Sequence, residues 1–337
     1  MNILENISLK PYNSFGIDKK ARFFVSVKNT SELIEALKWG NDRNLEVLIL
    51  GGGSNILLTQ DLEAVVIKIE LKGINADWET NEHVWVEAGS GESWHELVLF
   101  VIKQGWGGIE NLSLIPGTVG ASPMQNIGAY GVELKDVFHS LKALNRSTLE
   151  IEEFDNYQCL FGYRESIFKN ELKDQYIILY VTFKLDKHPV FKLEYGAIQE
   201  TLGQNKITSP SLKSVSDAVI AIRQSKLPDP KQIGNAGSFF KNPTISEEEF
   251  QGLKIKYPNM PGYPNELGVK VPAAWLIEQC GWKGKRFGEV GVHERQPLVL
   301  VNYGKGDGAA IRDLSQNIQR SVSEKFGIDL TPEVNFL

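Results

Sequence analysis

The chain has 337 residues, of which 42% are hydrophobic and 23% charged, so it is long enough for two or three subdomains. Its net charge of −6 argues against the basic surface of a nucleic-acid-binding protein. It has no apolar run long enough to cross a membrane, and we expect no signal peptide. The two cysteines, Cys159 and Cys280, do not form a paired framework, which favours a reducing cytoplasm.

The first part of the chain predicts a helix and buried strands around a glycine turn. Residues 31–41 have the spacing of an amphipathic helix, which Asn29 and Glu32 would cap. Residues 45–50 and 64–69 are typical of short buried strands, separated by a segment that begins G-G-G-S-N at 51–55. This glycine turn is not a dinucleotide fingerprint, which must open a helix, because strand-like residues follow it. Its amides suit a phosphate, and a glycine-rich hairpin is the structural alternative.

An uncharged stretch follows at residues 112–131, which we call the cradle. It comes after an expected strand at 83–88 and an expected helix through residue 104 that Ser93 would cap. Glycines at 117, 120, 128 and 131 permit close backbone approach to a ligand, and free amides favour an anion. We interpret the cradle as a buried ligand site without regular structure. A packed inter-domain crossover explains the stretch alone equally well.

The middle of the chain predicts a sheet and one held arginine. Strands are expected at residues 137–144, 149–154 and 176–185, in an antiparallel or mixed sheet. Arg164 lies between the last two strands among glycine and aromatic neighbours, which suits a guanidinium held for a carboxylate; an ordinary surface charge is the alternative. A helix is expected at 212–223, and the prolines at 228 and 230 mark a domain boundary at 226–231.

Two side chains beyond this boundary have the chemistry of proton transfer. Ser238 lacks the glycines of a nucleophile elbow and a histidine partner, so it is either a turn hydroxyl or a proton donor. Glu333 lies in an expected strand at 332–337, either facing solvent or buried with a raised pKa that allows acid catalysis. A helix starting at Pro272 is expected through residue 279, a strand at 298–301 and a helix at 309–326. The five histidines are scattered, so we expect no catalytic metal.

Four blocks together resemble the UDP-N-acetylenolpyruvoylglucosamine reductase family over almost the whole chain. They are I-P-G-T-V-G-A-S-P-M-Q-N-I-G-A-Y-G at 115–131, Y-R-E-S-I-F-K at 163–169, G-N-A-G-S-F-F-K-N-P at 234–243 and P-E-V at 332–334. The segment L-E-Y-G at 193–196 is similar to the longer subgroup of the family, in which a tyrosine loop covers the substrate. Ser122, where alanine is expected, is a conservative departure.

The resemblance implies an α+β chain: a two-subdomain FAD-binding fold of the vanillyl-alcohol oxidase (PCMH) type plus a C-terminal α+β substrate domain. The implied divisions are residues 1–72, 73–227 and 228–327, with residues 328–337 as a strand that returns to the active site. FAD would be bound non-covalently by two groups of residues. These are Gly51, Gly52, Gly53, Ser54 and Asn55 of the glycine turn and Ile115, Pro116, Gly117, Thr118, Gly120, Ala121, Gln125, Asn126, Ile127, Gly128, Ala129, Tyr130 and Gly131 of the cradle.

The resemblance also implies a reaction in cytoplasmic peptidoglycan synthesis, and thus in cell wall biogenesis, cell shape and division. It is the NADPH-dependent reduction of UDP-N-acetylglucosamine enolpyruvate to UDP-N-acetylmuramate through FAD. Ser238 would protonate the substrate, while Arg164 and Glu333 would stabilise charge on its carboxylate. The residues that would bind the nucleotide sugar are Tyr195, Lys226, Asn242 and Gln296. We expect a monomer with neither nucleic acid nor a membrane as partner.

Two other functions fit the sequence. A flavin oxidase of the same fold would act on an alcohol or lactone with O₂, and anaerobic bleaching by NADPH would separate it from the reductase. A nucleotide-sugar-binding regulator that kept the fold would be colourless as purified.

Overall fold

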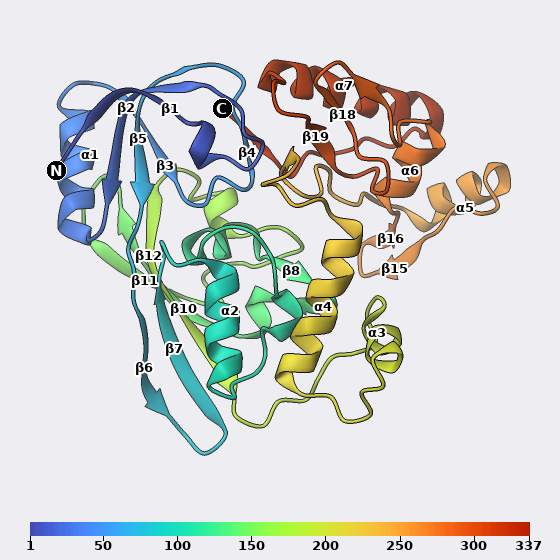
Figure 1. The fold of residues 1–337 in the computed structure, drawn as a ribbon, viewed down its shortest axis with the longest axis horizontal. Coiled ribbons are helices and arrows are strands. Elements are labelled where there is room, and N and C mark those ends of the chain that lie inside the picture. The colour runs from blue at the N-terminus through green and yellow to red at the C-terminus, as the bar shows by residue number, and fades with distance from the viewer. The chain divides into compact units, whose positions relative to one another are not determined.

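Two units share the chain, and each is built from three separate segments (Figure 1). The computed structural model describes residues 1–76 and 78–337. Unit 1 consists of Met1–Ile7, Ala21–Gly52 and Glu63–Ser225, and unit 2 of Ser8–Lys20, Gly53–Leu62 and Lys226–Leu337. The four-part division expected from the sequence stays a prediction.

The first sheet of unit 1 surrounds the start of the glycine turn. Its order is β1 (Leu4–Ser8), β2 (Lys20–Val27), β5 (Leu62–Ile69) and β3 (Glu46–Leu50). β3 and β5 run parallel, with Val47 opposite Val65, so the hairpin alternative for the glycine turn is wrong: parallel strands need a crossover. Leu33 and Leu37 of α1 (Thr30–Asn41) join the core of this sheet. The expected cap is confirmed, because Asn29 Oδ1 accepts from the Glu32 N–H at 2.9 Å.

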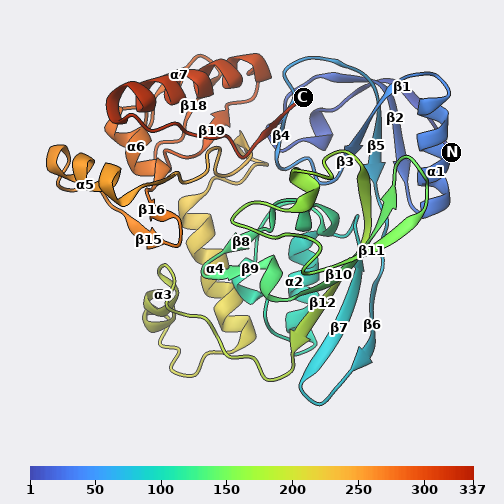
Figure 2. The ribbon, with the colours of Figure 1, turned by 180° about the vertical axis from the view of Figure 1, so that it is seen from behind.

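The strands of the second sheet of unit 1 pair antiparallel. Figure 2 shows its strands side by side, in the order β11 (Ile151–Asp155), β10 (Phe138–Asn145), β12 (Tyr176–Asp186), β7 (His83–Gly89) and β6 (Ile74–Glu79). The expected strands are confirmed within a few residues. Trp94 of α2 (Trp94–Lys103) packs on this sheet, its ring centroid 5.8 Å from that of Phe183. α3 (Ile198–Gln204), which the sequence did not predict, shares a small core with α4 (Leu212–Lys226).

Unit 2 contains small sheets and three helices. The first sheet has the order β13 (Gly234–Asn235), β19 (Leu300–Asn302), β18 (Val290–Val292) and β17 (Arg286–Phe287). The second has the order β14 (Thr244–Ile245), β16 (Gly268–Lys270) and β15 (Tyr263–Asn265). The third is the parallel pair β20 (Asn335–Phe336) and β4 (Ile56–Leu57). The helices are α5 (Glu247–Lys256), α6 (Ala273–Gln279) and α7 (Gly308–Phe326).

Three expected boundaries in unit 2 are wrong. Pro272 is the cap of α6 rather than its first helical residue, with an extended φ of −63° and ψ of 114°. The strand expected at 298–301 begins only at Leu300. The C-terminal strand is confined to Asn335 and Phe336, which pair with β4, because Pro332 and Glu333 pair instead with Phe240 and Phe239.

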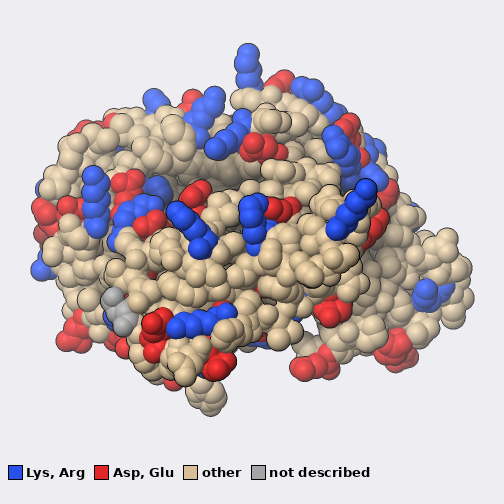
Figure 3. Space-filling model, turned by 60° about the horizontal axis from the view of Figure 1, so that its bottom comes forward, with Lys and Arg blue, Asp and Glu red and all other residues tan. Residues whose placement is uncertain are grey.

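Charged side chains of both signs are mixed on the face of the molecule that Figure 3 draws. Figure 3 shows Lys and Arg side chains interspersed with Asp and Glu over one face of the molecule. Within residues 1–76 and 78–337, no helix combines the length and apolar character that a membrane crossing requires.

Candidate functional site

The cradle is made of short turns rather than of an irregular loop. η3 (Val119–Ala121), η4 (Pro123–Gln125) and β8 (Gly128–Ala129) follow one another, and β8 pairs with β9 (Val132–Glu133). The expectation of a structureless segment is wrong because its buried amides pair locally. Only one side is buried: Val119 is inaccessible, whereas Pro116 and Ala121 are exposed. The cradle therefore has a core side and an accessible side.

Backbone segments of the glycine turn and the cradle lie unusually close together in unit 1. A Cβ on Gly52 would be 2.8 Å from Gly117 Cα, and one on Gly51 would be 2.9 Å from Thr118 Oγ1. The cradle is fixed there, because the Trp94 N–H donates to Gly117 O at 3.1 Å. Only glycine permits this approach without displacing the backbone. Small residues and exposed backbone of this kind fit FAD, whose phosphates require close backbone amides.

Arg164 is held against the end of the cradle. Its Nη2 donates to Gly128 O at 2.7 Å, and its guanidinium lies 5.4 Å from the ring centroid of Tyr163. The backbone at Arg164 has a φ of 57°, and its carbonyl accepts from Lys169 Nζ at 3.1 Å. A side chain fixed in this way is a preorganised cation rather than a mobile surface charge.

A second arginine beside the cradle, Arg223 of α4, was missed by sequence reasoning. Burial lowers the pKa of its guanidinium, nearby Tyr130 raises that pKa, and nearby Arg164 lowers it further. Among the residues that the structure describes, its Nε has no hydrogen-bond partner. The only signal in the sequence was a cation next to Ile222, on the buried side of an amphipathic helix. Two neighbouring guanidiniums make this part of unit 1 suited to an anion.

Tyr195 packs on the last residue of the cradle. A Cβ on Gly131, whose φ is 79°, would lie 2.2 Å from Tyr195 Cδ2. A Cβ on Gly196 would lie 3.2 Å from Tyr130 Cδ1, so each glycine faces the other segment's tyrosine. Tyr195 as a whole remains 60% exposed. Unit 1 thus brings Tyr195 to the same end of the cradle as Tyr130.

Ser238 and Glu333 lie on paired segments of unit 2. The Glu333 N–H donates to Phe239 O at 2.8 Å, and Phe240 forms a bridge with Pro332. Both phenylalanines are buried, Ser238 is exposed and Glu333 is half-buried, between the two positions expected for it. This pairing places the serine beside the carboxylate-bearing segment.

The end of the glycine turn belongs to the same region of unit 2. Asn55 Nδ2 donates to Glu333 O at 3.0 Å, and the Asn335 N–H donates to Asn55 O at 3.0 Å. Gly53 has a φ of 63°, and a Cβ there would lie 1.9 Å from Tyr12 O. Of the turn residues expected to bind FAD, Gly53 thus occupies a position that demands glycine, and Asn55 is held by its bonds to the C-terminal segment.

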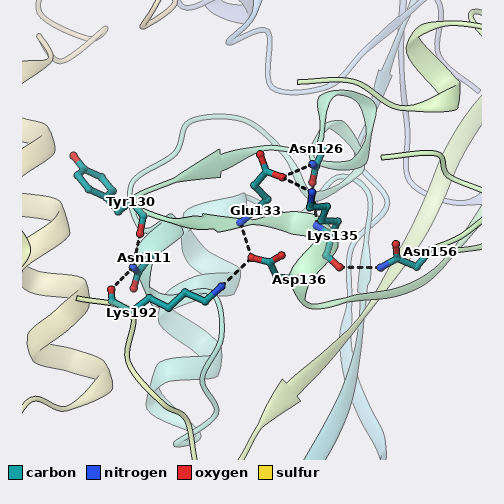
Figure 4. A network of polar contacts seen from close by, with 8 residues as sticks. All are labelled: Asn111, Asn126, Tyr130, Glu133, Lys135, Asp136, Asn156 and Lys192. Atoms are coloured by element: carbon teal, nitrogen blue, oxygen red, sulfur yellow. Dashed lines mark hydrogen bonds and ion pairs between the residues drawn. The ribbon is translucent and has the colours of Figure 1, made fainter. Parts of the chain in front are cut away.

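The remaining expected residues are in different environments. Lys226 is exposed at the end of α4. Asn242 Oδ1 accepts from the Ala273 N–H at 2.9 Å and supports α6, and Gln296 Oε1 accepts from the Leu298 N–H at 3.4 Å. Asn126 is buried, with its side chain bonded to Glu133, Lys135 and Gly162 (Figure 4). Any contact of Asn126 with FAD would thus be through its backbone.

Comparison with known proteins decides the family. Residues 229–337 match the C-terminal domain of UDP-N-acetylenolpyruvoylglucosamine reductase, and residues 21–151 match a FAD binding domain. Curated proteins named UDP-N-acetylenolpyruvoylglucosamine reductase are 54% identical in Flavobacterium johnsoniae, over 100% of both chains, and 48% identical in Pseudomonas aeruginosa, over 99% of both. The chain belongs to the UDP-N-acetylenolpyruvoylglucosamine reductase family. The crystal structure of that reductase from Thermus caldophilus shares its fold, with a TM-score of 0.67 at 22% identity over 99% of this chain and 98% of that one.

Membership of the reductase family confirms three expectations. The chain is a FAD-dependent oxidoreductase, it has an α+β fold, and it carries a FAD-binding domain followed by a family-specific C-terminal domain. The assignment to the tyrosine-loop subgroup and the roles of single residues stay predictions.

Proposed function

We propose that this chain reduces UDP-N-acetylglucosamine enolpyruvate to UDP-N-acetylmuramate with NADPH, for the synthesis of peptidoglycan. The observation that carries the proposal is the 54% identity to a reductase of that name over the full length of both chains. The chemistry of the site supports it, because the chain offers a glycine-lined cradle, a fixed arginine and a serine paired with a carboxylate segment.

The reaction adds two hydrogens across a carbon–carbon double bond. When bound, FAD would supply the redox chemistry, the transfer of hydride from NADPH to C3 of the vinyl group. The electron pair of the double bond then moves towards C2 and the adjacent carboxylate, and C2 takes up a proton. NADPH and one proton are consumed, and NADP⁺ is released. The protein must therefore stabilise negative charge and provide that proton.

Arg164 is the residue that we assign to the substrate carboxylate. Its planar guanidinium matches a carboxylate in shape and charge, and its bond to Gly128 O fixes its direction before substrate arrives. Arg223 adds a second buried positive charge in its neighbourhood. Glu333, when protonated, donates a hydrogen bond to the same carboxylate and so shares the developing charge.

Ser238 is the residue that we assign to protonation of C2. A hydroxyl is a weak acid in water, but the enediolate-like intermediate is a strong base, so the transfer is not uphill. A well-placed proton donor contributes about 10²–10⁴-fold. The exposure of Ser238 and its buried phenylalanine neighbours suit a hydroxyl presented on a rigid support.

The nucleotide sugar is assigned to four further residues. Tyr195 covers it, Lys226 binds its diphosphate as a point charge, and Asn242 and Gln296 add polar contacts. The enzyme acts in the cytoplasm as a monomer, without a nucleic acid or membrane partner.

An anaerobic assay with purified holoenzyme tests the proposal. NADPH should bleach the flavin, and UDP-N-acetylglucosamine enolpyruvate should restore its colour while gaining two hydrogens, as mass spectrometry would record. An oxidase of the same fold would instead need O₂ and an alcohol or lactone, and a regulator would be colourless. Bleaching by NADPH without consumption of the enolpyruvyl sugar would contradict the proposed substrate.

A further inference from the structure

We propose that Asn111 is a positioning residue that fastens the tyrosine loop, residues 192–196, to the end of the cradle. Nothing in the motifs singled out this asparagine, which belongs to the short turn η2 (Glu110–Leu112). The inference rests on the proposed role of Tyr195 in covering the substrate. It assigns to Asn111 the task of setting where that tyrosine lies.

One nitrogen atom of Asn111 joins the two segments. Nδ2 donates to Tyr130 O and to Lys192 O, each at 2.8 Å, and the side chain is inaccessible to solvent (Figure 4). These carbonyls lie 19 and 81 residues away along the chain. They also flank the tyrosine contact, because Tyr130 precedes Gly131 and Lys192 opens the loop that contains Tyr195. A single buried amide thus holds both sides of the Gly131–Tyr195 contact.

The side-chain oxygen of Asn111, Oδ1, shows that burying this amide is destabilising. Oδ1 is buried, and within the described part of the chain it has no hydrogen-bond partner. Leaving a buried acceptor unsatisfied is destabilising, so an asparagine used only for packing would be unfavourable. The two hydrogen bonds that Nδ2 donates offset this cost, and an apolar residue of similar size could not form them. This points to the two carbonyl contacts as the reason for the residue.

A second fastening at the surface supports the first. Lys192 Nζ lies 3.2 Å from Asp136 Oδ2, and Asp136 also accepts from the Glu133 N–H at 3.1 Å (Figure 4). This ion pair is partly exposed, and such pairs contribute little to stability because water screens them. The buried amide is therefore the stronger of the two links.

The short loop transmits the position of Lys192 to Tyr195. Three residues of fully extended chain span roughly 10 Å at most, so a fixed Lys192 carbonyl confines the Tyr195 backbone to a small region. Without the Asn111 amide, Tyr130 O and Lys192 O would lose their donor and the loop would be free to leave Gly131. Binding of the nucleotide sugar would then have to order the loop again, which weakens affinity.

A double-mutant cycle tests whether Asn111 acts through Tyr195. We expect Asn111→Ala to raise KM for the enolpyruvyl sugar about tenfold, to leave kcat within about twofold, and to speed amide hydrogen exchange at residues 192–196. Asn111→Ala combined with Tyr195→Ala should have the KM of Tyr195→Ala alone. The matched control is Asn156→Ala, which removes an amide bonded to Lys135 O at 2.8 Å in the same network but touches no residue of the loop.

Other outcomes separate this inference from the proposed function. Multiplicative effects of the two substitutions on KM would overturn the inference, since Asn111 would then act independently of Tyr195. If Tyr195→Ala leaves KM unchanged, the proposed role of Tyr195 fails, and hydrogen exchange alone decides whether Asn111 holds the loop. Should Asn111→Ala not fold, Asn111→Leu replaces it, because leucine keeps most of the buried volume but has no N–H for Tyr130 O and Lys192 O. Faster exchange at residues 192–196 in that variant supports the fastening, and unchanged exchange contradicts it.

Discussion

The ring of Tyr195 lies directly on the α-carbon of Gly131, so closely that a Cβ at this glycine would be 2.2 Å from Tyr195 Cδ2. The contact joins the uncharged cradle to a loop that a family resemblance associates with substrate. Glycine is required at position 131 for two reasons: the ring leaves no room for a Cβ, and the backbone there has a φ of 79°. The position of the tyrosine is thus tied to the smallest residue of the cradle.

Gly131→Ala should therefore displace Tyr195. We expect KM for the enolpyruvyl sugar to rise severalfold, together with a loss of roughly 1 kcal/mol in the free energy of unfolding from backbone strain. Steady-state kinetics and denaturant unfolding measure the two effects. Gly105→Ala is the matched control, because Gly105 has a φ of 83° and open space around its Cα, so it should lose stability without a change in KM. Equal KM changes in both variants would argue against a specific Gly131–Tyr195 contact.

Gly52→Ala should weaken FAD binding. The new Cβ would lie 2.8 Å from Gly117 Cα, and this backbone cannot move without shifting the cradle. We expect protein that folds but is purified with less than half the flavin content of wild type, measured by absorbance after denaturation. Gly203→Ala in α3, where nothing lies within 4 Å, should retain its flavin and gain slightly in stability. Full flavin occupancy in Gly52→Ala would contradict the assigned site.

Arg164→Lys should impair the step that uses the enolpyruvyl sugar. Lysine keeps the charge but loses the planar fork and the fixed direction provided by Gly128 O. We expect kcat/KM for the sugar to fall about 10–100-fold, while NADPH still bleaches the flavin. Arg146→Lys is the control, since Arg146 Nη2 bonds Val47 O at 2.9 Å and should affect stability alone. A similar fall in both variants would assign Arg164 to folding.

Glu110 should make the stability of the protein fall as pH rises. Burial raises the pKa of this carboxyl above its usual 4.5, although its bond from the Gly108 N–H at 2.6 Å acts in the opposite direction. The folded state then holds the proton to higher pH than the unfolded chain. The contribution is fully present below pH 4.5 and is lost as pH rises through the raised pKa.

Glu110→Gln removes this titration and keeps an oxygen that can accept from Gly108. Its free energy of unfolding, measured in urea between pH 4.5 and 8, should decline less with pH than that of wild type. Identical pH dependence in wild type and Glu110→Gln would show that Glu110 is not responsible.

Local features of the fold could be predicted from the sequence. The caps Asn29 and Ser93 each accept from a backbone N–H three residues later, a pattern contained within one turn. Four strands of the antiparallel sheet, β7, β10, β11 and β12, could be predicted in the same way, because their pattern lies within consecutive residues. The edge strand β6 was not predicted. Nor was the parallel pairing of Ile56 with Asn335, since nothing local links positions so distant.

The candidate site divides in the same way. Motifs pointed to Ser238, Arg164 and Glu333 one at a time, and the backbone bond from Glu333 to Phe239 became visible only in the folded chain. Arg223 and Asn111 were missed because an arginine on a helix and an asparagine in a turn are ordinary in sequence. Only the folded chain shows their burial and shows that they lie beside residues from other segments.

The most direct test of the account is a stopped-flow comparison of wild type and Ser238→Ala in the two halves of the reaction. NADPH should bleach the flavin of both proteins at similar rates. Recovery of the colour on mixing with UDP-N-acetylglucosamine enolpyruvate should then be slower by about 10²–10⁴-fold in Ser238→Ala, because C2 lacks its proton donor. Equal slowing of both halves, or wild-type recovery in the variant, would contradict the assignment of Ser238 and with it the proposed mechanism.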